Sequence, residues 1–328
     1  MLTATAIRLD IRGLAVELPT ETGWVRPVND VSLSLAEGET LGIVGESGSG
    51  KTMLSLALMG LEPPGARRSG EAWLETRDGP RVNLVAADPE QLRKMRGRDI
   101  AMIFQEPMTA LDPVMRIGAQ VEEAIRIHDS SASASEIGRR AIDALKRATV
   151  PEPELRARQY PHQLSGGLRQ RVMIATTLAP GPRILIADEP TTALDVTVQK
   201  QILELLAELR RELQLSMLFI THDLGVVAQI ADRLIVMYAG RIVEEGPTAE
   251  VLRRPRHPYT EGLLRAAPRL ERGKLTPIRG TVPALNALPP GCSFGSRCDI
   301  HVPECDSAVP ALREVGTADH RARCILAS

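Results

Sequence analysis

The octapeptide GESGSGKT (Gly45–Thr52) follows the apolar run TLGIV (Thr40–Val44) and precedes MLSLALMGL (Met53–Leu61). A short apolar run that ends at a glycine is typical of a buried strand, and the longer run after it is typical of a buried helix. The octapeptide matches the pattern GxxxxGK[ST], whose glycines let backbone N–H groups wrap around phosphate oxygens. A glycine-rich loop between strand and helix therefore predicts a nucleotide-binding P-loop.

Each residue of this loop is a candidate ligand for the phosphates of ATP. Lys51 would supply a point charge for the β- and γ-phosphates, and the Thr52 hydroxyl would bind Mg²⁺. The predicted nucleotide-binding residues of the loop are Gly45, Glu46, Ser47, Gly48, Ser49, Gly50, Lys51 and Thr52.

A second apolar run, RILIADEP (Arg183–Pro190), ends in two neighbouring carboxylates. In a P-loop fold, Asp188 would hold Mg²⁺ through water, and Glu189 would act as the general base for the attacking water. A pair of solvated carboxylates without a function is the alternative, and the accompanying P-loop disfavours it.

The stretch LSGGLRQR (Leu164–Arg171) places Ser165, Gly166 and Gly167 before a predicted helix. Ser165 suits the N-cap, and the N–H groups at a helix start attract anions. A second phosphate-binding site is predicted here, with an ordinary helix cap as the alternative.

Other apolar runs alternate with helical patterns. Strands are predicted at 5–18, 28–36, 100–104, 183–190 and 217–223, with two more within 233–246. Helices are predicted within 117–149, after Ser165 and at 196–213, a loop at 19–27 and a surface hairpin within 62–98. Buried strands alternating with helices indicate an α/β fold with a mostly parallel sheet covered on both faces.

Composition narrows the class of protein. The chain has 328 residues, 43% of them hydrophobic, which is enough for a large core with an appendage. Its 40 basic and 41 acidic residues give a net charge of −1, so no nucleic-acid partner is predicted. No apolar run approaches the ~20 residues of a membrane span, and the start has no signal-peptide pattern, so we expect a cytosolic protein.

The sequence pattern changes beyond Pro247, where prolines recur and the hydrophobic periodicity typical of helices and strands is weak. We place a domain boundary near residue 250. The four cysteines, Cys292, Cys298, Cys305 and Cys324, all lie in this tail. Their spacing, C-x5-C-x6-C-x18-C, fits neither a ferredoxin nor a zinc C-x2-C pair. Four thiolates could hold Zn²⁺ or an iron–sulfur cluster, and free or oxidised thiols are the other alternative.

Residues 5–250 resemble the ABC-type ATPases, whose signature is usually LSGGQ. Gln105 matches the Q-loop of that family, Asp195 the D-loop and His222 the switch histidine. The resemblance implies a P-loop NTPase (ABC ATPase) core, residues 1–250, with an antiparallel β subdomain and a helical subdomain at about 106–180.

The same resemblance implies partners and roles. Two such subunits, identical or paralogous, would form a head-to-tail dimer in which the signature of one faces ATP on the P-loop of the other. Catalytic roles are implied for Glu189, His222 and Gln105, and Mg²⁺ contacts for Thr52, Gln105 and Asp188. The aromatic residue that usually stacks on adenine is missing at Leu18, and Trp24 is the candidate substitute, with a loop anchor as the alternative.

The tail, residues 251–328, resembles the C-terminal region of the oligopeptide/dipeptide (Opp/Dpp-type) importer ATPases. HPYTEGLL (His257–Leu264) and IRGTVPALNALPPGCSFGSRC (Ile278–Cys298) carry the likeness, although the histidine of the usual FHPRC is absent. In that family four cysteines are taken to bind a [4Fe–4S] cluster, so Cys292, Cys298, Cys305 and Cys324 are its implied ligands, with Zn²⁺ as the alternative.

The importer resemblance implies an ATPase that drives di- and oligopeptide uptake at the cytoplasmic face of a bacterial or archaeal membrane. Its implied partners are two transmembrane permease subunits and, indirectly, an extracytoplasmic substrate-binding protein. Residues 106–118 would dock on the permeases or belong to the helical core. Nickel or another small solute is an alternative cargo. A non-transport ABC ATPase would carry long coiled-coil insertions or two cassettes, and this sequence shows neither. A kinase or GTPase would lack the LSGG signature and the switch histidine, and this sequence has both, the histidine at His222.

Overall fold

A computed structural model describes residues 6–21, 23–105, 110–192, 194–267, 277–316 and 319–327. Its strands form two sheets, one of four strands in the order β2-β1-β4-β5 and one of eight in the order β11-β12-β10-β9-β3-β8-β7-β6. Residues 106–109, which begin the predicted permease-docking segment, lie outside the described ranges.

The centre of the larger sheet is parallel, as the apolar runs predict. Its parallel strands are β3 (Thr40–Val44), β6 (Ile100–Ile103), β7 (Ile184–Asp188), β8 (Ser216–Thr221) and β9 (Arg233–Tyr238). Every residue of β3, β7 and β8 is buried, because helices or the smaller sheet cover both faces. Ile186 packs with α1 (Lys51–Met59) and the smaller sheet, whereas Leu185 packs with helices of the other layer.

The smaller sheet is antiparallel and corrects one prediction. Its strands are β1 (Ile7–Thr20), β2 (Gly23–Ala36), β4 (Arg67–Leu74) and β5 (Val82–Asn83), and helix α2 (Pro89–Met95) follows. The loop predicted at residues 19–27 is wrong, since β1 and β2 stay paired up to Thr20 and Gly23. Prolines at both ends of that stretch suggested a break, but both lie within strands at the outer part of the hairpin.

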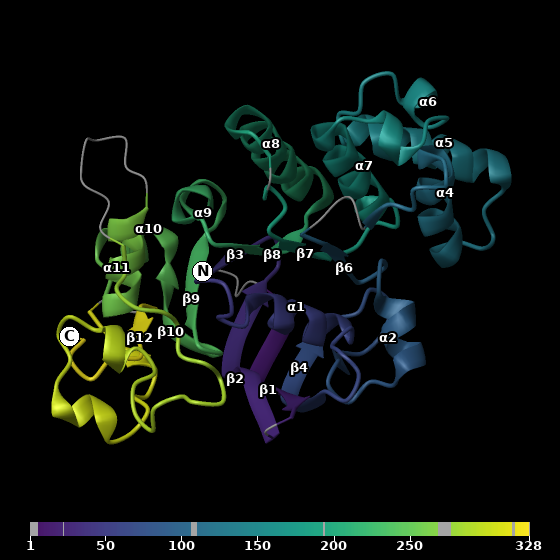
Figure 1. Ribbon diagram of the computed structural model, residues 1–328. Helices are drawn as coiled ribbons and strands as arrows, with labels where there is room; N and C mark the ends of the chain where they lie inside the picture. The colour runs from purple at the N-terminus through teal and green to yellow at the C-terminus, as the bar shows by residue number, and fades with distance from the viewer. Residues whose placement is uncertain are drawn as a thin grey trace, which may run out of the picture.

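Helices α4 (Ile117–His128), α5 (Ala134–Arg147), α6 (Pro153–Arg156) and α7 (Gly166–Leu178) form a helical subdomain. A short 3₁₀ turn, Pro161–Gln163, precedes α7. This subdomain has its own hydrophobic cluster around Val121, Ile137 and Leu145. Figure 1 shows it at the end of the molecule opposite the C-terminal tail, with α8 (Val196–Leu213) and α9 (Leu224–Ile230) between them.

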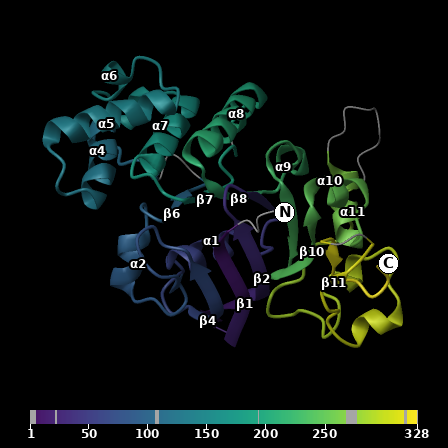
Figure 2. The same cartoon turned by 180° about the vertical axis from the view of Figure 1, so that it is seen from behind.

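The C-terminal tail extends the larger sheet. After β10 (Arg241–Pro247) come α10 (Thr248–Arg253), α11 (Pro258–Ala266), the 3₁₀ turns η2 (Gly295–Arg297) and η3 (Pro303–Asp306), and the strands β11 (Arg313–Glu314) and β12 (Arg321–Ala322). Strand β12 pairs antiparallel with β10, and Figure 2 shows the tail beside β10 from behind. The boundary near residue 250 stays a prediction, because two strands of the tail complete a sheet that begins before it.

A buried carboxylate fastens the tail to β10. Glu244 is fully buried and accepts hydrogen bonds from the backbone N–H groups of Arg256 (2.6 Å) and His257 (2.9 Å). His320 Nε2 lies 2.7 Å from Glu244 Oε1, the same oxygen that accepts from Arg256. Three polar groups of the tail therefore depend on one side chain of the core sheet.

Replacing Glu244 with Ala is expected to lower the free energy of unfolding by about 3 kcal/mol, because the buried partners would lose their acceptor. Chemical denaturation measures the change. The matched control is Glu208→Ala on the exposed side of α8, for which a change within about 0.5 kcal/mol is expected. Equal stabilities of the two variants would contradict the anchoring role of Glu244.

Candidate nucleotide-binding site

The glycine-rich loop joins β3 to α1, as its sequence context predicts. Gly50 is the N-cap of α1 with φ of +103°, a conformation that side chains disfavour. A Cβ at Gly50 would lie 2.0 Å from the carbonyl oxygen of Pro27 in β2, so only glycine fits. Ser47 and Gly48 of the loop are exposed. The loop and helix start form an anion-binding concavity.

Lys51 points back into the loop. Its Nζ donates hydrogen bonds to the carbonyl oxygens of Gly45 (2.7 Å) and Glu46 (3.1 Å) and to Ser49 Oγ (3.3 Å). Burial lowers the pKa of Lys51, and the nearby carboxylates of Glu189, Asp188 and Glu46 oppose that shift. A phosphate would give this desolvated ammonium the negative partner that it lacks among the loop carbonyls.

Asp188 and Thr52 fit a magnesium ion. Asp188 ends β7 with 1% of its surface exposed, and the Thr52 hydroxyl contacts its carboxylate. Its Oδ1 is buried and, among the described residues, has no hydrogen-bond partner. Burial raises the pKa of Asp188 to about 6, and the neighbouring Glu189 adds to the shift. An unpaired buried carboxylate oxygen beside a hydroxyl is the donor set that Mg²⁺ prefers.

Three predicted catalytic side chains converge from the ends of three neighbouring strands. Glu189 follows β7, and its Oε2 accepts a hydrogen bond from Gln105 Nε2 (3.2 Å), which follows β6. His222 follows β8, and its Nδ1 lies 3.3 Å from Glu189 Oε1. Parallel strands bring their carboxyl ends to one edge of a sheet, so residues far apart in sequence meet there.

The backbone of Glu189 adopts φ of +48°, which is uncommon for a residue with a side chain. Such a conformation costs free energy and is typical of functional sites. Thr192, which the sequence analysis did not select, donates from Oγ1 to Glu189 Oε2 over 2.7 Å. Its position in EPTTALD, three residues after Glu189, is the sequence signal that could have identified it.

The second predicted anion site begins α7. Ser165 is the N-cap, and its Oγ accepts a hydrogen bond from Leu168 N over 3.4 Å. A Cβ at Gly166 would meet no atom within 4 Å, whereas one at Gly167 would lie 2.9 Å from Val198 of α8. Among the described residues, no hydrogen bond or ion pair joins these three residues to the P-loop of the same chain. The helix start is therefore open to a ligand or a partner from outside.

Residues 28–192 match the ABC transporter family, and residues 243–305 match the oligopeptide/dipeptide transporter C-terminal region. The chain belongs to the ABC transporter family. Its sequence is 50% identical to a protein of Brucella melitensis provisionally named a peptide import ATP-binding protein, over 97% of this chain and 96% of that relative. A similarly named protein of Brucella abortus is 46% identical over 95% of this chain and 93% of its own length.

Solved ABC cassettes share the fold. The dimeric ATP-binding cassette MJ0796, in a post-hydrolysis state bound to ADP and Pi, superposes with a TM-score of 0.64 at 30% identity, covering 73% of this chain and 98% of that chain. The transporter component cbiO1 from Clostridium perfringens gives 0.62 at 27% identity, covering 76% and 92%. This chain is an ABC ATPase, and its fold is the predicted P-loop core with antiparallel β and helical subdomains.

Two further predicted residues of this ABC ATPase have local partners. Asp195 is the N-cap of α8, and its Oδ1 accepts hydrogen bonds from the backbone N–H groups of Thr197 and Val198, each over 3.0 Å. Trp24 lies on β2 with 43% of its surface exposed, and the Arg67 guanidinium stands 3.9 Å from its ring centroid. Adenine stacking on Trp24 stays a prediction.

The four cysteines of the ABC ATPase come together around one small apolar pocket, together with Ile325 and Leu326. All four are free thiols, and burial raises the pKa of Cys292 and of Cys298. Within the described ranges, no group of three or more histidine, cysteine or acidic residues is arranged to hold a metal ion. The sulfur atoms gather in one place but are not set in a ligand geometry.

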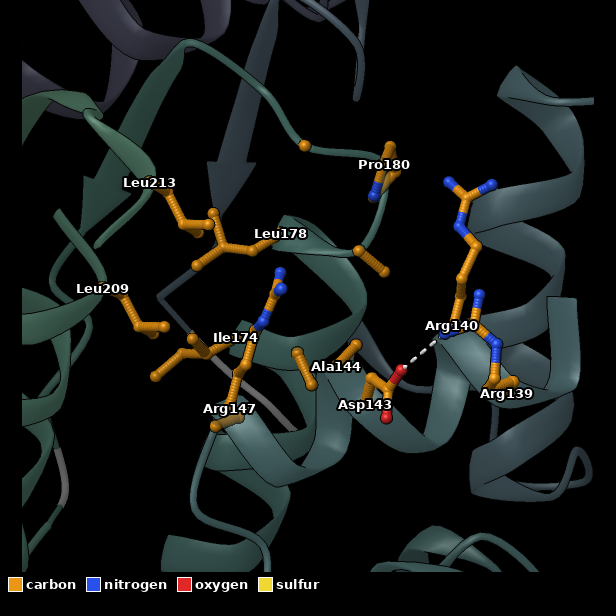
Figure 3. Close-up of a pocket in the computed structure, with 14 residues that line it drawn as sticks. Arg139, Arg140, Asp143, Ala144, Arg147, Ile174, Leu178, Pro180, Leu209 and Leu213 are labelled. Atoms are coloured by element: carbon orange, nitrogen blue, oxygen red, sulfur yellow. Dashed lines mark hydrogen bonds and ion pairs between the residues drawn. The ribbon is translucent and has the colours of Figure 1, made fainter. Parts of the chain in front are cut away.

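A separate pocket of about 320 Å³ lies between α5, α7 and α8, and Figure 3 shows the residues that line it. Leu178, Leu209 and Leu213 supply apolar lining, and Arg139, Arg140 and Arg147 also line the pocket. Each guanidinium already has an acidic partner: Arg139 pairs with Glu136 and Asp143, Arg140 with Asp129, and Arg147 with Glu212. No anion-binding function follows from this pocket.

None of the helices in the described ranges has the length and apolar character of a membrane span.

Proposed function

We propose that this ABC ATPase drives the import of di- and oligopeptides from the cytoplasmic face of a bacterial or archaeal membrane. The match of the tail to the oligopeptide/dipeptide transporter region carries the proposal, and the names of the relatives support it. Its partners are two transmembrane permease subunits and, indirectly, a substrate-binding protein. The proposed division is a nucleotide-binding domain, residues 1–250, and a transporter-type C-terminal region, residues 251–328.

Within this proposal the site residues divide the work of hydrolysis. Lys51 and the loop N–H groups neutralise and orient the phosphates, and Glu189 accepts a proton from the attacking water. Gln105 and His222 hold the Glu189 carboxylate in place, as their contacts with it indicate. Thr52, Asp188 and the amide oxygen of Gln105 would hold Mg²⁺, which supplies positive charge to the phosphate oxygens when it is bound.

The second half of the site comes from another subunit, either a copy of this chain or a paralogue. Ser165, Gly166 and Gly167 are proposed to contact the γ-phosphate held by the P-loop of the partner, and Asp195 lies at the same proposed interface. The open space at Gly166 supports this, because a helix N-terminus without a local partner suits an external anion.

Reconstitution with the cognate permeases and binding protein tests the peptide cargo. We expect labelled di- or oligopeptides to accumulate in vesicles only with hydrolysable ATP, and peptide-loaded binding protein to raise the ATPase rate. Ni²⁺ offered in parallel is expected to do neither. Stimulation by Ni²⁺ alone would replace the peptide proposal with the nickel alternative.

The pocket lined by the four cysteines, here called the Cys pocket, is proposed to hold a [4Fe–4S] cluster, with Zn²⁺ as the alternative. Convergence of Cys292, Cys298, Cys305 and Cys324 on one pocket supports a thiolate site, and loading it requires the thiols to deprotonate and turn inward. Anaerobically purified protein is expected to be brown, with about four iron and four sulfide per chain. Cys298→Ser should lose the colour and loosen residues 280–328, while the ATP-binding core stays folded.

Iron, zinc and sulfide analysis of the same preparation separates the outcomes. Colourless protein with about one zinc per chain would select the zinc alternative. If the protein is free of metal and its tail is as resistant to proteolysis as that of metal-loaded protein, both the iron–sulfur and the zinc hypotheses are rejected.

A further inference from the structure

Glu46, the second residue of the P-loop, is held by residues of the C-terminal tail. Its backbone N–H donates to the Tyr259 hydroxyl over 2.8 Å. Its carboxylate receives two hydrogen bonds from Arg297, over 2.6 Å to Oε2 and 3.0 Å to Oε1. Its carbonyl oxygen accepts from Lys51 Nζ. Two of the three polar groups of Glu46 are thus engaged by residues more than 200 positions away in sequence.

Arg297 is buried in the tail, and its guanidinium is directed at Glu46. Only 3% of its side chain is exposed, and Glu46 supplies its one salt bridge among the described residues. Its Nε donates to the Arg279 carbonyl oxygen over 2.8 Å, and the rings of Tyr238 and Phe294 each lie 5.8 Å from the guanidinium carbon. A buried guanidinium with a two-point carboxylate partner is a directed interaction, unlike the exposed ion pairs on the surface.

A negatively charged carboxylate in a phosphate-binding loop repels the phosphates that the loop binds. Burial lowers the pKa of Lys51, and the negative charge of Glu46 is close enough to oppose that shift, so it would also repel the phosphates that Lys51 attracts. The Arg297 guanidinium, bound directly to the Glu46 carboxylate, neutralises this charge. Tyr259 fixes the backbone of the same residue, so the loop keeps its course while the charge is neutralised.

We propose that Arg297 and Tyr259 are positioning residues of the ATP site, which neutralise and hold Glu46 and thereby make the C-terminal tail part of the nucleotide-binding machinery. The inference rests on the proposed P-loop chemistry. It extends that chemistry to a region assigned so far only to the transporter type. The tail then sets the affinity for ATP rather than the rate of the chemical step.

Arg297 also lies beside the Cys pocket. It closes the 3₁₀ turn η2, in which Arg297 N donates to Phe294 O and Cys298 N donates to Gly295 O. Gly295 N in turn donates to Cys292 O. A short series of backbone hydrogen bonds therefore joins two cysteines to the residue that holds the P-loop, and ATP affinity depends on the folded state of that turn.

Arg297→Met, Glu46→Gln and the double variant test the proposal in the full-length chain. The probe is a fluorescent, non-hydrolysable ATP analogue with Mg²⁺, and ATP turnover is measured in parallel. Arg297→Met is expected to raise the dissociation constant about tenfold, with kcat at saturating ATP within about twofold. The matched control is Arg265→Met, in the same tail, because Arg265 pairs with Asp299 and Glu261 instead of the loop.

Rescue distinguishes charge neutralisation from a general loss of structure. Glu46→Gln in the Arg297→Met background removes the uncompensated carboxylate, so the dissociation constant should return to within about threefold of the wild type. Raising the salt concentration should likewise reduce the defect of Arg297→Met. A defect that appears in kcat with an unchanged dissociation constant, or a double variant no better than Arg297→Met, would overturn the proposal. A wild-type chain that does not bind the analogue would refute the ATP site itself.

Discussion

Glu189→Gln is expected to lower steady-state ATP turnover about 10²-fold or more, because the attacking water loses its general base. The amide keeps the shape of the side chain and can still contact Thr192 and Gln105, so ATP binding should persist. We expect the variant to accumulate an ATP-bound dimer. Turnover assays with the complete transporter, and size measurements with and without ATP, report both effects.

Lys51→Ala is the contrasting variant for Glu189→Gln. It removes the charge that faces the phosphates, so it should weaken nucleotide binding itself and give no ATP-trapped dimer. Near-normal steady-state hydrolysis by Glu189→Gln would show that another group takes the proton, and the role of Glu189 would then be wrong.

Gly166→Asp is expected to reduce hydrolysis about 100-fold while ATP still binds to the P-loop of the same chain. In the proposed head-to-tail dimer, the new carboxylate would project from the start of α7 toward the γ-phosphate held by the partner, and like charges at close range cost several kcal/mol. Nothing within 4 Å blocks a Cβ at this position, so the fold should tolerate the substitution. Equilibrium ATP binding and turnover, measured on the same sample, separate the two steps.

Gly138→Asp is the matched control for Gly166→Asp. It adds the same charge to α5 of the helical subdomain, where the nearest atom to an added Cβ is Glu122 Oε1 at 3.9 Å. Because that position is not at a helix start that faces a phosphate, turnover should stay within about threefold of the wild type. Equal losses in both variants would point to damage to the subdomain rather than to a shared ATP site.

Local signals in the sequence account for much of the nucleotide site. The P-loop needs glycine at Gly50 for steric reasons, and that requirement is visible as a motif. The strand that ends in Asp188 and Glu189 is a continuous apolar run, as a strand buried on both faces must be. The convergence of Gln105, Glu189 and His222 follows once their three strands are placed parallel in one sheet.

Long-range contacts of the tail could not be predicted in this way. Strand β12 has two residues, too few for any periodicity, and it forms only because β10 offers an open edge. The pairing of Arg297 with Glu46 joins two charged residues that each look solvated in sequence. The hairpin through residues 19–27 was missed because proline and glycine there indicate a loop, whereas pairing along the rest of β1 and β2 carries the strands through.

A mixing experiment tests the shared ATP site most directly. In a head-to-tail dimer of one Glu189→Gln chain and one Gly166→Asp chain, one site carries both defects and the other carries neither. Mixing the two inactive variants before adding ATP should therefore restore about a quarter of the wild-type activity, since about half of the dimers are mixed and each has one intact site. If mixed dimers form and the mixture stays as inactive as its components, each chain must complete its own site, and the account is contradicted.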